Sequence, residues 1–260
     1  MMPWKSFASD LARKSGVLLK EKFNATHEIE YKGEINIVTE ADKMSEALII
    51  EAIRRYFPGH GILSEESPAV LGTEKLRWII DPLDGTTNYA HGYPVFCVSI
   101  ALEKEGKIIL GVIYDPMRDD MFIAVRDEGV YLNDQKITVS SVDKISRCLL
   151  ATGFPYDIRD SKENNLEYFN AMAVNVQAIR RAGAAALDLA YLAAGRFDGF
   201  WELKLKPWDT AAGCLMVKEA GGKITDLFGN QWNISSPHLL ASNGMIHQQM
   251  MDIFYRAAGK

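Results

Sequence analysis

Apolar side chains recur at helical spacing in two segments near the N-terminus, and each segment predicts an amphipathic helix. Trp4, Phe7 and Leu11 begin such a series within residues 4–22. A second series runs through residues 43–57 and is followed by a Pro-Gly pair, a combination that ends helices. In both segments the apolar stripe is expected to face the core.

Between residues 30 and 136 the pattern changes to alternating or continuous apolar runs, which are typical of strands. Apolar and polar side chains alternate in residues 30–39, around Gly33, and this pattern predicts a hairpin. Further strands are predicted at 61–63, 78–80, 95–103, 107–114, 121–126 and 129–132, with a tight polar turn at 133–136. The first part of the chain is therefore expected to contain two helices and a sheet with mostly hairpin connections.

From residue 148 onward, predicted strands alternate with predicted helices. The strands are expected at 148–152, 178–180, 199–203 and 223–226, and the helices at 166–176, 184–194, 210–220 and 245–257. The polar segment 156–165 predicts a loop. This layout is α+β. A chain of 260 residues suits one compact unit of two closely packed halves, 1–145 and 146–260.

Composition narrows the functional classes. No apolar run approaches the ~18 residues of a transmembrane helix, and charged residues interrupt the N-terminal apolar positions, so neither a membrane span nor a signal peptide is expected. The formal net charge of -5 argues against a nucleic-acid binder. The 3 cysteines are far apart and the 5 histidines are scattered, which favours a cytoplasmic setting and disfavours a zinc enzyme.

The segment 78–90 carries the most informative chemistry. An apolar strand delivers two carboxylates, Asp81 and Asp84, and a turn at Gly85 and Thr86 leads into a helix. Hard cations such as Mg²⁺ prefer oxygen ligands, and a helix N-terminus favours an anion such as phosphate. The segment therefore indicates metal-assisted chemistry on phosphate esters. Taken alone, it could also be an acidic loop with a threonine cap.

Two further segments supply acids at the ends of predicted elements. Glu65 and Glu66 follow the short strand 61–63, and Asp209 stands at the start of the helix 210–220. Taken singly, the glutamates could form a solvated turn, and Asp209 could cap its helix. Together with the preceding aspartate pair, these acids can converge on one metal cluster.

These three segments resemble the signature motifs of the inositol monophosphatase family of magnesium-dependent phosphatases. Residues 181–190 and 195–199 are similar to the bacterial branch of the family, and the likeness extends from about Leu11 to about Ile253. The resemblance implies a five-layer αβαβα sandwich of the inositol monophosphatase and fructose bisphosphatase type, with the active site between the two halves. It also implies a homodimer.

The resemblance further implies two or three Mg²⁺ ions per subunit, with lithium as an inhibitor. A first ion is implied at Glu65, Asp81 and the Leu83 carbonyl, and a second at Asp81, Asp84 and Asp209. Two ions in this arrangement lower the pKa of an attacking water and stabilise both the attacking and the leaving oxygen. Water is expected to attack in line, without a phosphoenzyme.

The same resemblance assigns catalytic roles to Glu65, Thr86 and Asp42. Thr86 is expected to position the attacking water, and an acid must accept its proton because a hydroxyl is a poor base. Asp42 is the candidate for that acid. It could also cap the helix 43–57, and the two roles are compatible.

Substrate contacts are implied in both halves of the chain. The phosphate is expected on the N–H groups of Gly85 and Thr86. The remaining contacts are expected at Asp84, Gly183, Ala184, Ala185, Glu202 and Lys206. Glu202 could accept from neighbouring hydroxyls or be an exposed strand residue. Lys206 could contact phosphate or be solvated.

The resulting hypothesis is Mg²⁺-dependent hydrolysis of a small phosphomonoester, inositol monophosphate, to inositol and phosphate. An alternative keeps the metal site and changes the substrate to fructose 1,6-bisphosphate, histidinol phosphate or a 3′-phosphoadenosine nucleotide. A dual activity on inositol monophosphate and fructose 1,6-bisphosphate is part of this alternative, because some prokaryotic relatives are dual. Residues 88–94 resemble the inositol phosphatases more than the histidinol or nucleotide branches. A third hypothesis is a regulatory or assembly role, because some bacterial relatives also contact the transcription machinery. The presence of every expected metal carboxylate argues against a purely structural protein.

Overall fold

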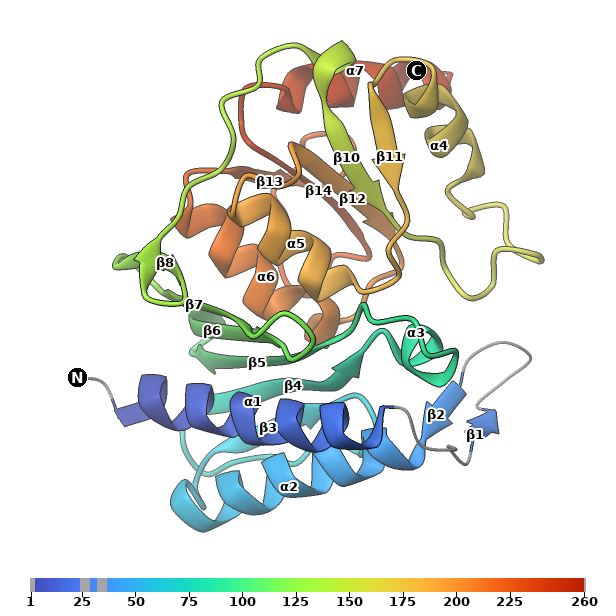
Figure 1. The fold of residues 1–260 in the computed structure, drawn as a ribbon. Helices are drawn as coiled ribbons and strands as arrows, with labels where there is room; N and C mark the ends of the chain where they lie inside the picture. The colour runs from blue at the N-terminus through green and yellow to red at the C-terminus, as the bar shows by residue number, and fades with distance from the viewer. Residues whose placement is uncertain (1–2, 24–28, 32–36, 260) are drawn as a thin grey trace.

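The computed structural model describes residues 3–23, 29–31 and 37–259, with side chains described for residues 4–23 and 38–259. Two β-sheets alternate with three layers of helices (Figure 1). The successive helical layers are α1 (Pro3–Lys22) with α2 (Glu40–Tyr56), α5 (Ala185–Ala193) with α6 (Pro207–Glu219), and α4 (Leu166–Ala173) with α7 (His247–Ala257). The arrangement is the expected five-layer αβαβα sandwich of the α+β class.

The first sheet has seven strands in the order β3-β4-β5-β6-β7-β8-β9. Its strands are β3 (Gly61–Ser64), β4 (Leu76–Asp84), β5 (Cys97–Lys104), β6 (Lys107–Asp115), β7 (Asp120–Val125), β8 (Gly129–Leu132) and β9 (Gln135–Lys136). β3 and β4 are parallel, and the later neighbours pair antiparallel. Because Ser64 pairs with Ile80, the acids that follow these two positions lie at one edge of the sheet.

The second sheet has five strands in the order β11-β10-β12-β14-β13. They are β10 (Leu149–Thr152), β11 (Ala178–Arg180), β12 (Gly199–Leu203), β13 (Lys223–Thr225) and β14 (His238–Ser242). β10 is parallel to both of its neighbours, and β14 is antiparallel to both of its own. The last strand in the sequence is therefore inserted between two earlier ones.

Three apolar cores fill the spaces between the five layers. On β4, Trp78 and Ile80 pack toward α1 and α2, whereas Ile79 packs toward α5 and α6. On β12, Phe200 belongs to the central core and Trp201 to the core against α4 and α7. The alternation follows from the two-residue period of a strand. Because both faces of each sheet are covered, the central strands β4 and β12 are mainly apolar, and their acids Asp81, Asp84 and Glu202 line the cavity.

Two helices begin earlier than the sequence pattern predicts. α2 begins before residue 43, since Thr39 is its N-cap and Asp42 occupies the third position of a capping box. α6 begins at Pro207, so Asp209 lies within the first turn. Neither aspartate is therefore the N-cap of its helix.

The smaller elements show where the pattern succeeds and where it fails. β1 (Ile29–Tyr31) and β2 (Ile37–Thr39) pair antiparallel as a hairpin requires, and their connection at 32–36 lies outside the described residues. The predicted turn at Gly85 leads into the short helix α3 (Thr86–Ala90). β9 lies within the segment predicted as a polar turn, and β14 is missing from the prediction. In the described ranges, no helix has both the length and the apolar character needed to cross a bilayer.

Candidate active site

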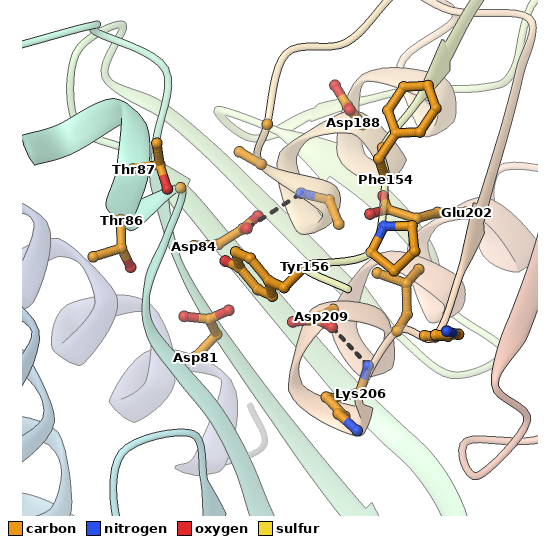
Figure 2. Close-up of a pocket in the computed structure, with 18 of the residues that line it drawn as sticks. Asp81, Asp84, Thr86, Thr87, Phe154, Tyr156, Asp188, Glu202, Lys206 and Asp209 are labelled. Atoms are coloured by element: carbon orange, nitrogen blue, oxygen red, sulfur yellow. Dashed lines mark hydrogen bonds between the residues drawn. The ribbon is translucent and has the colours of Figure 1, made fainter. Parts of the chain in front are cut away.

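A cavity of about 330 Å³ gathers every predicted metal and substrate residue. The first half contributes Glu65, Asp81, Leu83, Asp84, Gly85 and Thr86, and the second half contributes Gly183, Ala184, Ala185, Glu202, Lys206 and Asp209. Asp42 is fully buried behind this wall and bonds to Thr86. Figure 2 shows the acids of both halves facing the same space. The structure thus brings the predicted residues together, while their individual roles stay predictions.

The turn between β4 and α3 presents the first two acids. Gly85 has a φ of 97°, and a Cβ at this position would approach a neighbouring backbone carbonyl oxygen to 2.9 Å, so glycine is required. The Ser45 hydroxyl on α2 donates to the Pro82 carbonyl at 2.7 Å. The Leu83 N–H donates to Asp81 Oδ1 at 3.1 Å. The turn is therefore fixed both from within and by α2.

Thr86 and Asp42 form a hydrogen-bonded pair. Thr86 Oγ1 donates to Asp42 Oδ1 at 2.9 Å and lies 3.1 Å from the Leu83 carbonyl oxygen. Asp42 Oδ2 accepts from the Thr39 N–H at 2.8 Å and from its hydroxyl at 2.6 Å. Burial raises the pKa of Asp42, and the bonds from Thr39 and Thr86 oppose that rise. With its hydrogen directed at Asp42, the Thr86 oxygen keeps a lone pair for a donor in the cavity.

Asp84 joins the two halves of the molecule. Its carboxylate accepts from the Ala186 N–H at 2.7 Å and from the Ala185 N–H at 3.2 Å, both in the first turn of α5. The Cys97 thiol donates to the same carboxylate at 3.6 Å. A helix N-terminus stabilises the charged form of an acid, but burial outweighs this effect and raises the pKa of Asp84 to about 6.

Asp81 and Asp209 complete the group of acids. Asp209 accepts from the Lys206 N–H at 2.6 Å (Figure 2), and burial raises its pKa to about 7, with the charge of Asp84 acting in the same direction. Burial also raises the pKa of Asp81 well above its usual range, followed by the charges of Glu65, Asp84 and Asp209. Acids that repel one another in this way are stabilised by a cation placed among them.

The segment after β3 is held by α2. Glu65 lines the cavity beside Asp81, because it follows Ser64 on the parallel neighbour of β4. The buried Glu46 accepts from the Glu66 N–H at 3.2 Å and from the Ser67 hydroxyl at 2.5 Å. The helix α2, which carries the hydrogen-bond partner of Thr86, thus also fixes the second acidic segment.

Comparison with known proteins identifies the family. The model described as the inositol monophosphatase family matches residues 1–258. The chain belongs to the inositol monophosphatase family. Nus factor SuhB of Escherichia coli (strain K12) is 40% identical over 254 residues, which cover 96% of this chain and 95% of that protein.

Solved structures give the same result for the fold. Inositol monophosphatase from Anabaena (Nostoc) sp. PCC 7120 is 42% identical with a TM-score of 0.89, over 97% of this chain and 95% of that one. SaIMPase-II, in a crystal structure with inositol monophosphate bound, is 26% identical with a TM-score of 0.83, over 99% of this chain and 97% of that one. Membership of the inositol monophosphatase family supports a phosphatase activity, and the family is generally metal-dependent.

The donor atoms suit the metal dependence of the inositol monophosphatase family. In the part of the chain that the structure describes, no group of three or more acidic, histidine or cysteine side chains could hold a metal ion as it stands. Asp84 and Asp209 are directed at backbone N–H groups instead. The predicted ligands are nevertheless all carboxylate or carbonyl oxygens, the donors that Mg²⁺ prefers, and they line one cavity.

Glu202 belongs to the opposite wall of the cavity. It is half-buried on β12 rather than an exposed strand residue, and a Cβ on Gly153 would overlap its carboxyl. Burial raises the pKa of Glu202 well above its usual range, followed by the charges of Asp209 and Asp188, while Arg181 opposes the rise. The side chain of Lys206 is exposed at the rim.

The cavity also contains residues that sequence reasoning missed. Tyr156, from the loop after β10, projects between Asp84 and Asp209 in Figure 2. The guanidinium of Arg181 lies 5.8 Å from the ring centroid of Phe154. Arg181 belongs to the segment 181–190 that resembles the family, but its place in the cavity was not predicted, and no local pattern pointed to Tyr156.

Proposed function

We propose that this chain is a Mg²⁺-dependent phosphatase that hydrolyses inositol monophosphate to inositol and phosphate. The observation that carries the proposal is the Thr86–Asp42 pair at the edge of a cavity lined by Asp81, Asp84 and Asp209. A hydroxyl with a buried proton acceptor, set among metal-binding oxygens, is suited to direct water at a phosphate ester. SaIMPase-II with bound inositol monophosphate supports the choice of substrate.

The metal would be held by Glu65, Asp81, Asp84, Asp209 and the carbonyl of Leu83. When bound, Mg²⁺ supplies a water of lowered pKa and neutralises negative charge on the phosphoryl oxygens. The contribution of the chain is a set of buried acids that repel one another, which favours the binding of a cation.

Thr86 and Asp42 would orient the attacking water. Thr86 Oγ1 accepts a hydrogen bond from the water, and Asp42 Oδ1 receives the proton of the Thr86 hydroxyl as the water transfers its own proton to Thr86. Glu65 would act on the reaction through a further water. The N–H groups of Gly85 and Thr86 would bind the phosphate oxygens.

The alcohol portion would lie between the first turn of α5 and β12. Gly183, Ala184 and Ala185 form one side of this space, and the carboxyl of Glu202 forms the other. Glu202 would accept hydrogen bonds from hydroxyl groups, and Lys206 would contact the phosphate from the rim. A cavity of about 330 Å³ suits a small sugar or polyol monophosphate.

A substrate panel tests the proposal. Phosphate release is measured from inositol monophosphate, fructose 1,6-bisphosphate, histidinol phosphate and 3′-phosphoadenosine 5′-phosphate, first with Mg²⁺ and then with EDTA. We expect Mg²⁺-dependent release that is fastest with inositol monophosphate. Release led by another substrate would keep the mechanism and correct the substrate, whereas no release from any of them would overturn the enzymatic proposal.

Asp81→Asn tests the centre of the metal site. Asparagine keeps the size of the side chain and an oxygen for the Leu83 N–H, but it removes the charge. We expect kcat/KM to fall about 10³-fold, which corresponds to several kcal/mol of lost charge stabilisation, and calorimetric titration should show weaker Mg²⁺ binding. The exposed Asp10→Asn on α1 is the matched control. Near-normal turnover by Asp81→Asn would contradict the assignment.

A binding role is the second candidate, favoured by the 40% identity to the protein named Nus factor SuhB. Pull-down from native extract with wild-type protein and with Asp84→Asn separates the two roles. A protein partner retained equally by both would establish a role that is independent of phosphate chemistry.

Two further properties are proposed from the family resemblance. A homodimer is expected, and light scattering at several concentrations would measure it. Inhibition by Li⁺ is also expected, and activity measured with LiCl against matched KCl would detect it.

A further inference from the structure

Asp188 on α5 is a buried acid whose carboxyl has no hydrogen-bond partner among the residues that the structure describes. Its residue is only 2% exposed, and it lines the cavity. Within the described ranges nothing donates a hydrogen bond to its carboxyl, and burial, followed by the charge of Asp84, raises its pKa well above the usual range. A carboxyl in so enclosed a place loses much of its hydration, which destabilises the fold unless another group or a ligand binds it. The presence of Asp188 at this position therefore needs an explanation.

Other buried acids in the described part of the chain are hydrogen-bonded. Asp115 accepts from the Arg118 guanidinium and from the Tyr191 hydroxyl, each at 2.9 Å. Asp198 accepts from a hydroxyl at 2.5 Å and from a backbone N–H at 2.8 Å. The same holds for Asp42, Glu46, Asp81, Asp84 and Glu103. Asp188 is the exception. Its oxygens are not sealed in the core but face the cavity, so their hydrogen-bonding capacity is open to a ligand.

Asp188 and Glu202 share one end of the cavity (Figure 2). The charge of Asp188 contributes to the raised pKa of Glu202, after burial and Asp209, which places the two carboxyls within electrostatic reach. Phe154 lies beside both of them in Figure 2, and Arg181 completes the wall. This end therefore offers two carboxyl groups next to an aromatic ring.

We propose that Asp188 and Glu202 together bind hydroxyl groups on the alcohol portion of the substrate, and that Asp188 determines specificity. The inference rests on the proposed phosphatase function and deepens it. The substrate class is a phosphate ester of a polyol with at least two free hydroxyls at the end remote from the phosphate. A carboxylate accepts from hydroxyls, and a protonated carboxyl also donates to one. Two neighbouring carboxyls thus match two neighbouring hydroxyls.

The surroundings argue against a cation at this end. Arg181 lies close enough to Glu202 for its positive charge to act on that carboxyl, and it would repel a metal ion. An alcohol without hydroxyls would leave both carboxyls buried and unpaired, so the site also discriminates against such substrates.

Asp188→Leu with two substrates of similar size tests the inference. Inositol monophosphate carries hydroxyls around its ring, and phenyl phosphate carries none. We expect kcat/KM for inositol monophosphate to fall about 10- to 100-fold, mainly through KM, because a buried hydrogen bond to the substrate is lost. With phenyl phosphate the change should stay within about threefold. Glu202→Gln should likewise lower kcat/KM for inositol monophosphate relative to kcat/KM for phenyl phosphate. Asp10→Leu on the surface of α1 should change kcat/KM for neither substrate.

Thermal unfolding separates this role from a structural one. Removing an unpaired buried carboxyl should leave the Tm of Asp188→Leu equal to or above that of the wild type. A lower Tm, with equal losses on both substrates, would overturn the proposal. Asp188→Asn keeps the volume and provides a second variant if the leucine protein does not fold.

Product binding keeps the test independent of catalysis. If wild-type protein hydrolyses neither substrate, the proposed function fails, but calorimetric titration with inositol still examines Asp188. Binding to wild type that weakens about tenfold or more in Asp188→Leu would support the inference. Equal binding to both proteins would overturn it.

Discussion

The two ends of the active-site cavity hold their acids in different ways. At the end formed by β4, α2 and α3, here called the fixed end, Asp42 and Asp84 each accept at least two hydrogen bonds from the protein. At the end formed by β12 and α5, here called the free end, the carboxyls of Asp188 and Glu202 accept none from the described residues. Groups that must act at one point are held in place. Groups that are to meet the hydroxyls of a ligand keep their hydrogen-bonding capacity for it.

The largest expected effect comes from the fixed end, at Thr86. Thr86→Val keeps the shape of the side chain but removes the hydroxyl that Asp42 orients. We expect kcat for inositol monophosphate to fall about 10²- to 10⁴-fold, the range for loss of a proton-transferring group, with a smaller change in KM. Steady-state kinetics measures both constants.

Thr86→Ser is the control for that experiment, because it restores the hydroxyl without the methyl group. It should keep most of the wild-type kcat. If Thr86→Val retained kcat within about threefold, the Thr86–Asp42 pair would be structural only.

A buried histidine, His247, contrasts with Asp188 because each of its ring nitrogens has a hydrogen-bond partner in the protein. His247 is 1% exposed, and its two ring nitrogens lie 2.9 Å from the Thr225 hydroxyl and 2.8 Å from the Ser242 hydroxyl. Burial, together with the charge of Lys223, lowers its pKa from 6.5 to about 4. As the pH falls, His247 therefore binds a proton in the unfolded chain before it does so in the folded chain. The free energy of unfolding should fall between pH 6.5 and pH 4, by at most ~1.4 kcal/mol per pH unit from this group.

Denaturant unfolding of wild type and His247→Gln at several pH values measures this contribution as a difference. The subtraction is needed because the cavity acids have raised pKa values and act in the opposite direction, adding stability as the pH falls. The difference in unfolding free energy should shrink toward low pH. A difference independent of pH would refute the assignment.

The smallest expected effect sharpens the comparison at the free end. In Gly153→Ala the new methyl group would displace the Glu202 carboxyl, which is the mobile end of a long side chain and can move at little cost. We expect KM for inositol monophosphate to rise about three- to tenfold, since one hydrogen bond to a hydroxyl is weakened. The Tm should shift by only a few degrees. An equal rise in KM for phenyl phosphate would point to general disruption of the cavity instead.

The sequence predicts much of the fixed end because its geometry is local. The apolar run of β4 carries Asp81 and Asp84 to a turn that requires Gly85, and all of these lie within one short segment. The limits of α2 are less well predicted, since Thr39 was not recognised as the cap that begins the helix ahead of Asp42. The five layers and the residue roles entered through the family resemblance.

The free end could not be predicted in the same way. Asp188 occupies an ordinary helical position, and it lines the cavity because α5 packs against α6 and both sheets, which are distant in the sequence. Tyr156 and Arg181 lie in loops whose course depends on long-range contacts. β14 is short, and its place between β12 and β13 is set by pairing with strands distant in the sequence.

The insertion of β14 sets an order of events during protein synthesis. Residues 39–86 supply most of the fixed end and leave the ribosome early, whereas β12, which carries Glu202, lacks its antiparallel neighbour until residues 238–242 have been made. The wall of the cavity that is proposed to bind the alcohol portion of the substrate is thus completed last, after most of the wall with the proposed metal ligands. A nascent or truncated chain that stops before residue 238 exposes two unpaired strand edges, which are templates for aggregation.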